Sequence, residues 1–261
     1  MRWQYGYASL VLCSVFVVLT FGVLESDVDR YLDRCLRSKY HKEKPGKEGS
    51  YFHCSPWENH ACCTANTTRN IQVDGTVSMY NMKWDQCNQT MSPKCRRFFE
   101  MDTCFYECSP NLAPWIVVDK YSKKTRRERV VQIPLCASAC DEWFDACKDD
   151  LTCSNNWGNY STWNWKTGMC KMECKTFKEY FGGPEKFCNK IFNHSFSYSR
   201  GTPGKDCFIL WPNSTLISAN IRVARKAAKK AMEVNSKAAS FAITSFVVIF
   251  VSFAVLLIVS V

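Results

Sequence analysis

Hydrophobic and polar positions alternate with helical spacing most clearly in residues 136–150, CASACDEWFDACKDD. Cys136, Cys140, Trp143 and Cys147 fall on one face of a helix, while the acidic residues of the segment point elsewhere. This pattern predicts an amphipathic helix that disulfide bonds fasten to the body of the protein along its inner face.

A second helical pattern begins at Pro93 and runs to the turn-forming sequence SPNLAPW. Cys95, Phe99, Asp102 and Tyr106 share one face of this helix, at spacings of four, three and four residues. Asp102 therefore lies on an inward stripe, between a cysteine and a tyrosine, where an acid needs a partner.

Strand patterns are weaker and shorter than the helical ones. Residues 76–84, TVSMYNMKW, and 129–135, RVVQIPL, have some strand character. No repeat or linker divides the chain between its ends. We expect a single disulfide-rich globular domain of the α+β class, with several helices, short strands and long loops.

Both ends of the chain are apolar and are read as processing signals rather than as parts of the fold. Residues 1–24 have the basic start and apolar centre of a secretory signal peptide, with cleavage expected between Gly22 and Ser26. A signal anchor is the alternative. The ligand-binding domain is then expected to span residues 25–235.

Residues 236–261 are predicted to be a C-terminal GPI-attachment signal. The stretch is apolar from Phe241 to Val261, follows small and polar residues, and is not followed by basic residues. The expected attachment residue is Ser236 or Asn235. The alternative is a single membrane-spanning helix; both place the domain on the outer face of the plasma membrane.

Cysteine usage agrees with an extracellular domain. The chain has 17 cysteines, of which Cys13 lies in the predicted signal peptide. The even number that remains predicts a framework of about eight disulfides, although spacing does not determine the pairing. Zinc binding by pairs such as Cys104/Cys108 is the competing interpretation.

Five N-x-S/T sequons predict surface glycans; they begin at Asn66, Asn88, Asn159, Asn193 and Asn213. The net charge of +10 comes partly from residues 222–230, RVARKAAKK, which we read as solvated residues near anionic headgroups. A second basic cluster, residues 123–130, is either a solvated loop or a segment that attracts an anionic ligand electrostatically. Nucleic acid is not an expected partner of an extracellular domain.

The segment 153–170, CSNNWGNYSTWNWKTGMC, concentrates aromatic residues between two cysteines. Two interpretations remain open: a small core beneath a loop, or a wall against which a flat ligand ring stacks. The sequence contains no nucleophile elbow, phosphate loop or metal triad. We therefore expect a binding protein without a cofactor, and not an enzyme.

The chain closely resembles the folate receptor family. The resemblance covers nearly the whole predicted domain and rests on HKEKPG (41–46), PWENHACC (56–63), DTCFYECSPNLAPW (102–115), RERVVQIPLC (127–136), CSNNW and WNW within 153–165, FCNKIFNHSF (187–196) and YSRG (198–201). It implies a GPI-anchored cell-surface receptor that binds folate or a related pterin in an aromatic pocket and delivers it by endocytosis.

The resemblance also implies the site residues. The family's pterin-binding aspartate corresponds to Asp102, whose carboxylate would accept two N–H bonds from the pterin edge. Structural pairing of Asp102 with one of the two pocket arginines is the alternative. The other corresponding residues are Tyr80, Tyr106, Arg126, Arg129, Trp157, Trp163, Trp165, Phe192 and Ser195.

The chain departs from the family pattern around the rest of the ligand. Thr125 replaces a tryptophan, Phe192 replaces another, and Met82 replaces a phenylalanine. The segment 158–162 is two residues longer than the family's backbone clamp and contains the Asn159 sequon. The changes at Thr125 and 158–162 favour the alternative of a receptor that recognises a protein on another cell, as the family's egg-surface member does. A third possibility is a binder of another flat heterocycle such as riboflavin.

Overall fold

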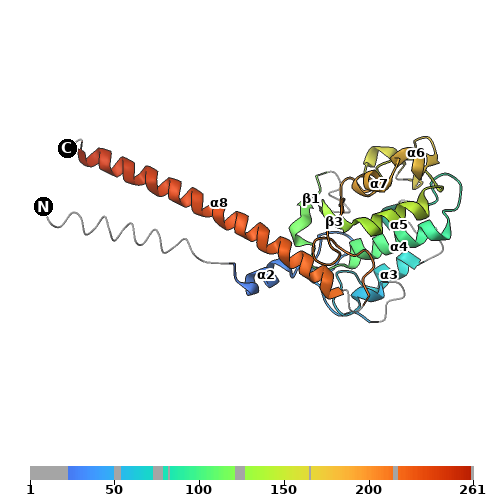
Figure 1. The fold of residues 1–261 in the computed structure, drawn as a ribbon, viewed down its shortest axis with the longest axis horizontal. Coiled ribbons are helices and arrows are strands. Elements are labelled where there is room, and N and C mark those ends of the chain that lie inside the picture. Colours follow the sequence, from blue (N-terminus) through green and yellow to red (C-terminus); the bar gives the residue numbers. More distant parts are fainter. Residues whose placement is uncertain are drawn as a thin grey trace.

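The computed structural model describes residues 23–49, 54–72, 79–81, 83–120, 127–164, 166–213 and 217–259, with side chains described as far as residue 239. Within this part of the chain, seven α-helices and four short turns of 3-10 helix surround four two-stranded sheets (Figure 1). The α+β prediction is confirmed.

The helices carry most of the core. The α-helices are α2 (Glu25–Leu32), α3 (Ala65–Gln72), α4 (Pro93–Cys108), α5 (Ala137–Cys147), α6 (Phe177–Phe181), α7 (Pro184–Lys190) and α8 (Ile217–Val259). The 3-10 turns are η2 (Ser55–Trp57), η3 (Met79–Asn81), η4 (Ala113–Trp115) and η5 (Tyr160–Thr162).

The strands are two to four residues long and form no extended sheet among the described residues. Antiparallel pairs join β1 (Ile116–Val118) to β2 (Glu128–Val130), β4 (Leu151–Thr152) to β7 (Lys175–Thr176), and β5 (Trp163–Asn164) to β6 (Met169–Cys170). The parallel pair is β3 (Ile133–Cys136) with β8 (Phe196–Ser199).

The predicted strand at residues 129–135 is broken in two, between β2 and β3. Gln132 has a positive φ of 59°, which turns the chain out of the extended conformation. The predicted strand at 76–84 is wrong where it is described, because Met79–Asn81 form η3; residues 73–78 lie outside the described part.

Helix α4 is fixed in place at its N-terminal end. At its N-terminus, the hydroxyl of Ser92 accepts a hydrogen bond from Cys95 N, and Pro93 occupies the first turn. Asp150 holds this cap in place by accepting bonds from Ser92 N and Oγ, both at 2.6 Å. The helix then runs past α5, to which Cys95 is joined by the disulfide with Cys147.

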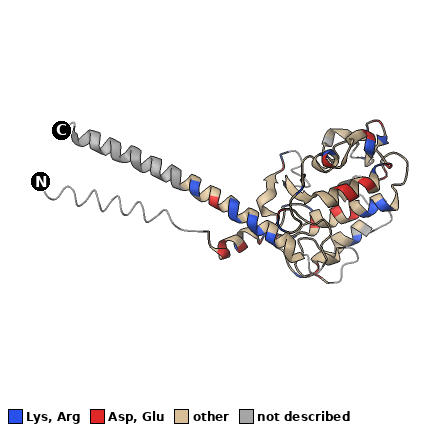
Figure 2. Ribbon diagram, viewed as in Figure 1, with Lys and Arg blue, Asp and Glu red and all other residues tan. Residues whose placement is uncertain are grey.

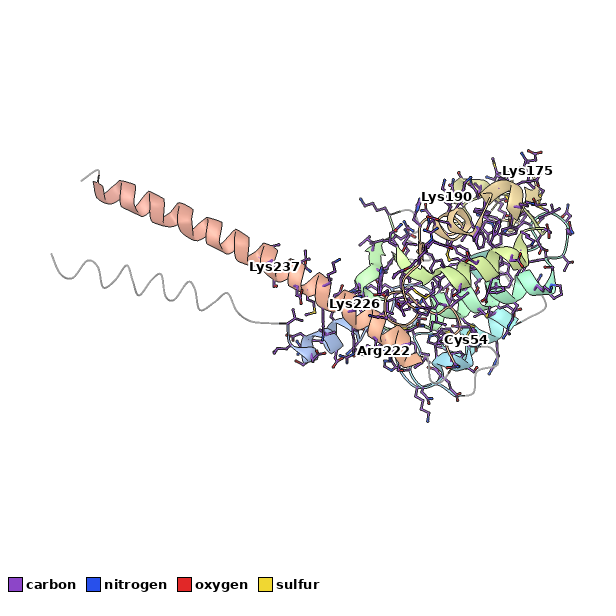
Figure 3. All side chains as sticks on the ribbon, viewed as in Figure 1. Cys54, Lys175, Lys190, Arg222, Lys226 and Lys237 are labelled. Carbon is purple, nitrogen blue, oxygen red and sulfur yellow. A yellow bond between two sulfur atoms is a disulfide. The ribbon has the colours of Figure 1, made fainter. Side chains whose placement is uncertain are left out.

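Eight disulfides confirm the predicted framework. They are Cys35–Cys62, Cys54–Cys104, Cys63–Cys108, Cys87–Cys174, Cys95–Cys147, Cys136–Cys207, Cys140–Cys188 and Cys153–Cys170. Cys104 and Cys108 therefore bond to different partners instead of jointly offering thiolates to a metal, and the zinc interpretation is wrong. Side chains fill the space between the bridged helices (Figure 3).

Helix α8 begins as part of the domain. The face of α8 that packs on the domain is buried and consists of Ala219, Val223, Ala224 and Ala228. The side chain of Asn220 forms two hydrogen bonds of 2.9 Å with the backbone of residue 209. The helix then leaves the domain and continues to Val259 (Figure 1).

Several basic residues at the start of α8 pair with acids of the domain, in addition to being exposed to solvent. Arg225 pairs with Glu25 at 3.0 Å and also with Asp29, both on α2. Lys229 pairs with Glu25, and Lys226 contacts the Asp206 carboxylate at 2.7 Å. Figure 2 shows this basic band of α8 beside the acidic residues of α2.

The predicted ends of the chain stay predictions. Residues 1–22 of the predicted signal peptide and the side chains of the apolar tail lie outside the described part. Among the helices searched within the described part, none is long and apolar enough to cross a membrane.

Candidate functional site

The inward stripe predicted on α4 is present. Cys95, Phe99 and Asp102 are buried on this helix, and Tyr106 is half-buried one turn beyond Asp102. At a rise of about 1.5 Å per residue, the stripe from Phe99 to Tyr106 is roughly 10 Å long. It forms the axis along which the other candidate residues are arranged.

Asp102 is the most strongly perturbed acid on this stripe. Its side chain is 5% exposed, and its Oδ1 atom has no hydrogen-bonding partner among the described residues. Burial, with a smaller contribution from the nearby Glu107 carboxyl, holds the pKa of Asp102 well above its usual range. A buried acceptor of this kind is suited to an N–H donor brought in by a ligand.

A second buried acid, Glu107, lies near the end of α4. It is 1% exposed, and its Oε1 accepts a hydrogen bond of 2.9 Å from the hydroxyl of Tyr80. The Tyr80 hydroxyl also lies 2.9 Å from Ser38 Oγ. Burial and the neighbouring Glu107 raise the pKa of Tyr80 well above its usual range.

His41 completes this buried polar cluster. Its Nε2 atom lies 3.2 Å from the carbonyl oxygen of Tyr106, and its Nδ1 atom lies 3.2 Å from Glu107 Oε2. The imidazole ring also meets the ring of Tyr106 edge to face, with centroids 5.9 Å apart. Burial lowers the pKa of His41 to about 4, although the bond to Tyr106 opposes the shift.

Glu107, His41 and Ser38 were not predicted as site residues. A signal for Glu107 was present, because CFYEC places an acid directly between Tyr106 and Cys108 in a stretch with buried cysteines. Sequence spacing gave no signal that His41 and Ser38, more than 60 residues earlier, pack against this end of α4.

Trp157 and Trp163 lie in an aromatic core at the other end of the stripe. Trp157 stacks on Phe99 with centroids 4.5 Å apart and an interplanar angle of 10°. Its indole N–H donates to Thr152 Oγ1, and the indole N–H of Trp163 donates to the carbonyl oxygen of Trp157, both at 3.0 Å. These tryptophans serve as core for the loop, and a role in lining a ligand pocket stays a prediction.

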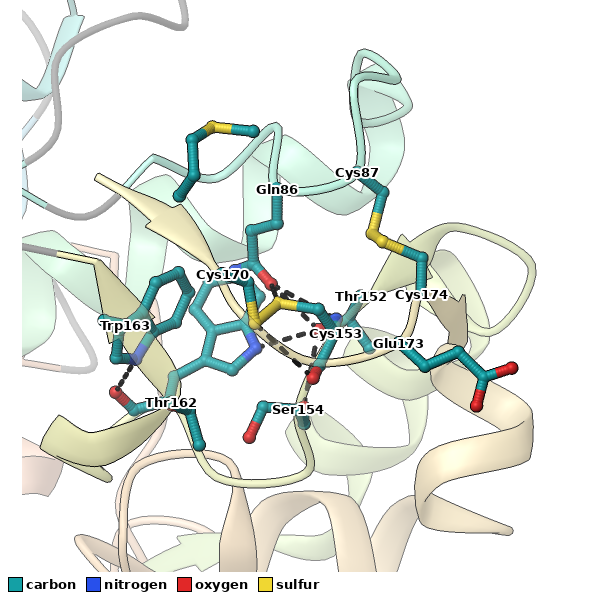
Figure 4. Close-up of a disulfide and its surroundings, with 12 residues drawn as sticks. Gln86, Cys87, Thr152, Cys153, Ser154, Thr162, Trp163, Cys170, Glu173 and Cys174 are labelled. Carbon is teal, nitrogen blue, oxygen red and sulfur yellow. Dashed lines mark hydrogen bonds between the residues drawn. A yellow bond between two sulfur atoms is a disulfide. The ribbon is translucent and has the colours of Figure 1, made fainter. Parts of the chain in front are cut away.

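The disulfide Cys153–Cys170 closes the base of this loop (Figure 4). Gln86 Oε1 accepts a hydrogen bond of 3.1 Å from the Thr152 hydroxyl, and so links the loop to the segment before α4. Cys87, the neighbour of Gln86, is bonded to Cys174. The loop is therefore fixed by covalent and hydrogen bonds at the same place.

The turn at residues 192–195 brings three candidate residues together. Ser195 Oγ donates to the carbonyl oxygen of Phe192 at 2.8 Å, and Arg129 donates to the carbonyl oxygen of Asn193 at 2.8 Å. The Phe192 ring contacts Trp157 edge to face, with centroids 6.0 Å apart. The turn thus links the arginine on β2 to the aromatic core.

Two candidate residues, Arg126 and Trp165, lie outside the described residues, as do Thr125 and Met82. The described residues therefore do not test pairing of Asp102 with Arg126. One contact of Arg129 is its hydrogen bond to the backbone carbonyl oxygen of Asn193.

The sequons differ in accessibility. Asn66, Asn88, Asn159 and Asn213 are exposed, whereas Asn193 is half-buried. The Asn193 side chain accepts a bond of 3.3 Å from Asn156, and a Cβ atom added at Gly158 would lie 2.8 Å from Asn193 Cβ. Asn193 is thus the most confined of the five predicted glycan positions.

The arrangement is that of a binding domain: an eight-disulfide α+β fold with a buried carboxyl on a stripe between an aromatic core and a polar cluster. No group of three or more metal-binding side chains occurs among the described residues.

Comparison with known proteins defines the family. The model of the Folate receptor family matches residues 34–209. Human folate receptor gamma is 40% identical over 202 residues, which cover 74% of this chain and 79% of the relative. Bovine folate receptor alpha is 41% identical over 203 residues, covering 74% and 80%.

A riboflavin-binding protein from Dromaius novaehollandiae is 32% identical over 190 residues, covering 72% of this chain and 76% of the relative. The chain belongs to the folate receptor family. The relatives are named as receptors and as a vitamin-binding protein, not as enzymes.

Proposed function

We propose that this protein is a cell-surface receptor that binds folate or a reduced folate and delivers it by endocytosis. Family membership supports binding of a small vitamin. The observation that carries the proposal is Asp102, a buried carboxyl with an acceptor atom that no described residue satisfies.

In this proposal the pterin edge donates two N–H bonds to the Asp102 carboxylate. Aromatic residues along the α4 stripe enclose the flat ring, with Tyr106 and Tyr80 at one end and Phe192, Trp157 and Trp163 at the other. The family resemblance adds Trp165, which lies outside the described residues. Arg126, Arg129 and Ser195 supply polar contacts. Residues 25–235 form the ligand-binding domain, and a GPI anchor at Ser236 or Asn235 holds it on the membrane.

The proposed function is tested by titrating folate into the secreted ectodomain and following tryptophan fluorescence. We expect saturable binding, because the residue that matches the family's pterin-binding aspartate, Asp102, is buried with an unsatisfied acceptor atom. No binding with or without the Asn159 glycan would favour the alternative, a receptor for a protein on another cell.

The Asn159 glycan is expected to restrict access without abolishing binding. Asn159 is exposed at the start of η5, and its side chain accepts a bond of 3.1 Å from Ser161 N. Asn159→Gln should bind folate at least as tightly as the wild type, with a faster association rate. Asn66→Gln, at an exposed sequon on α3, is the matched control and should leave the rate unchanged; equal rates for all three proteins would remove the glycan from the binding pathway.

Acidification is expected to weaken folate binding. The pKa of Asp102 in the unliganded protein is raised, whereas the bound ligand favours the ionised carboxylate. Binding therefore releases a proton, and the dissociation constant should rise by up to about tenfold per pH unit below the pKa of the free protein.

Calorimetry in two buffers of different ionisation enthalpy, repeated over a series of pH values, measures this proton release. Titrations at neutral and endosomal pH measure the change in affinity. Equal affinity at both pH values, with no released proton, would contradict the prediction.

A further inference from the structure

The buried polar cluster behind Tyr80 forms a continuous chain of hydrogen bonds whose directions can be assigned. The Tyr80 hydroxyl donates its single proton to Glu107 Oε1. The bond between Ser38 and Tyr80 must then be donated by Ser38. The chain therefore runs from Ser38 through Tyr80 to the carboxyl on α4.

At the other end of this chain of hydrogen bonds, the position of one proton on His41 can also be assigned. The carbonyl oxygen of Tyr106 can only accept, so His41 Nε2 carries a hydrogen. In a neutral imidazole, Nδ1 is then an acceptor that faces Glu107 Oε2 at 3.2 Å. Two acceptors at this distance repel each other unless a proton lies between them.

The preference of His41 for the neutral form indicates where this proton lies. Because burial lowers the pKa of His41 to about 4, we place the proton on Glu107. Glu107 is then a neutral carboxylic acid that donates to His41 and accepts from Tyr80. With this proton on Glu107, burial is the cause that remains for the raised pKa of the neighbouring Asp102.

The backbone conformation of Tyr80 has to be held by contacts of its side chain, and the hydrogen bond to Glu107 is such a tether. Its φ of 62° and ψ of 18° lie in the left-handed region, which is unfavourable for a bulky residue unless surrounding contacts hold it. Besides its hydroxyl bonds, Tyr80 has an edge-to-face contact with Tyr40, with centroids 5.0 Å apart. Released from Glu107, the ring would lose its only described bond to α4.

We propose that Glu107 is a positioning residue for the ligand site: with His41 as its proton partner, it holds the Tyr80 ring in place beside the Asp102 stripe. The proposal rests on the proposed function, in that Tyr80 acts as a wall for the ligand. Glu107 itself need not touch the ligand.

The proton assignment makes glutamine the informative substitution. The amide of Glu107→Gln can accept from Tyr80 through its oxygen and donate to His41 through its nitrogen, as the neutral acid does. Glu107→Leu keeps a similar volume but breaks both bonds. We expect Glu107→Gln to bind folate within about threefold of wild type, and Glu107→Leu to bind roughly tenfold more weakly, the loss of about one hydrogen bond.

A double-mutant cycle distinguishes positioning of Tyr80 from a general loss of stability. Tyr80→Phe keeps the ring but removes the tether, and should weaken binding as much as Glu107→Leu. Combining Tyr80→Phe with Glu107→Leu should add little further loss. Additive losses, or an unchanged affinity of Glu107→Leu, would overturn the proposal.

The matched control is Asp150→Ala, which removes the cap support at the opposite end of α4. It should lower the melting temperature without changing folate affinity. If Asp150→Ala lost folate affinity in proportion to its loss of stability, any weakening of α4 would disturb the site. That result would overturn a specific role for Glu107.

A measurement on the unliganded protein tests the role of Glu107 independently of folate binding. Hydrogen–deuterium exchange of residues 79–87 should increase in Glu107→Leu and Tyr80→Phe, but not in Glu107→Gln. If wild-type protein does not bind folate, the proposed function fails while exchange still tests the tether. Unchanged exchange in Glu107→Leu would overturn the tether itself.

Discussion

Replacing Asp102 by alanine is expected to weaken folate binding by about 2–5 kcal/mol, or roughly 30- to 5,000-fold. The loss is large because the ligand's N–H donors would be left buried and unpaired. Asp102→Asn should lose a comparable amount, since its amide nitrogen would face the same donors. Calorimetric titration measures both variants, and an unchanged affinity would remove Asp102 from the site.

The same asparagine substitution is expected to stabilise the unliganded domain at neutral pH. The folded-state pKa of Asp102 is raised above the ordinary value of 3.8, so the folded protein binds more protons than the unfolded chain in the window between these two pKa values. The free energy of unfolding therefore falls as pH rises through that window. Asparagine does not ionise, so the Asp102→Asn variant does not lose this stability.

The melting temperature of Asp102→Asn should accordingly exceed that of wild type at neutral pH, and the difference should disappear at acidic pH below the ordinary pKa. A variant that loses affinity and gains stability would identify a functional residue retained at the expense of the fold. A lower melting temperature at neutral pH would contradict the assignment of a raised pKa.

Replacing Phe99 by alanine is expected to reduce the free energy of unfolding by about 3–5 kcal/mol. Phe99 is 1% exposed, and its ring stacks on Trp157 and meets Trp143 edge to face at 5.2 Å. The cavity would open in the middle of the aromatic core. For a domain of this size, the melting temperature should fall by roughly 6–20 °C.

Phe98→Ala is the matched control for this prediction. Phe98 is the neighbouring residue on α4 and is only half-buried; it stacks on Trp143 with centroids 6.5 Å apart. It should lower the melting temperature by much less. Scanning calorimetry of the oxidised domain compares the two variants, and equal losses would show that Phe99 has no special place in the core.

Helical periodicity predicted the two central helices, because their buried residues recur along one face. The same reasoning placed Asp102 inward, although it could not show what surrounds it. Density of cysteines predicted eight bridges, but the pairing depends on contacts such as Cys87 with Cys174, which are 87 residues apart. No local pattern encodes such a distance.

In the candidate site, too, local patterns could be predicted from the sequence and contacts between distant segments could not. Asp102 and Tyr106 were placed together because they lie one turn apart on a single helix. The contact of His41 with Glu107 was missed because it joins segments far apart in sequence. The sequence drew attention to Trp157, but only the structure shows that it stacks on Phe99. The turn at Gln132 was missed because a positive φ at glutamine has no sequence signature.

The first and last described helices, α2 and α8, lie outside the disulfide framework, because α2 precedes Cys35 and α8 follows Cys207. Ion pairs such as Arg225 with Glu25 and small aliphatic contacts join α8 to the rest of the domain. A mechanical load applied through the C-terminal tail would reach this seam before any cross-linked element. Because exposed ion pairs weaken as the salt concentration rises, the attachment of α8 to the domain should weaken with salt more than the cross-linked body does.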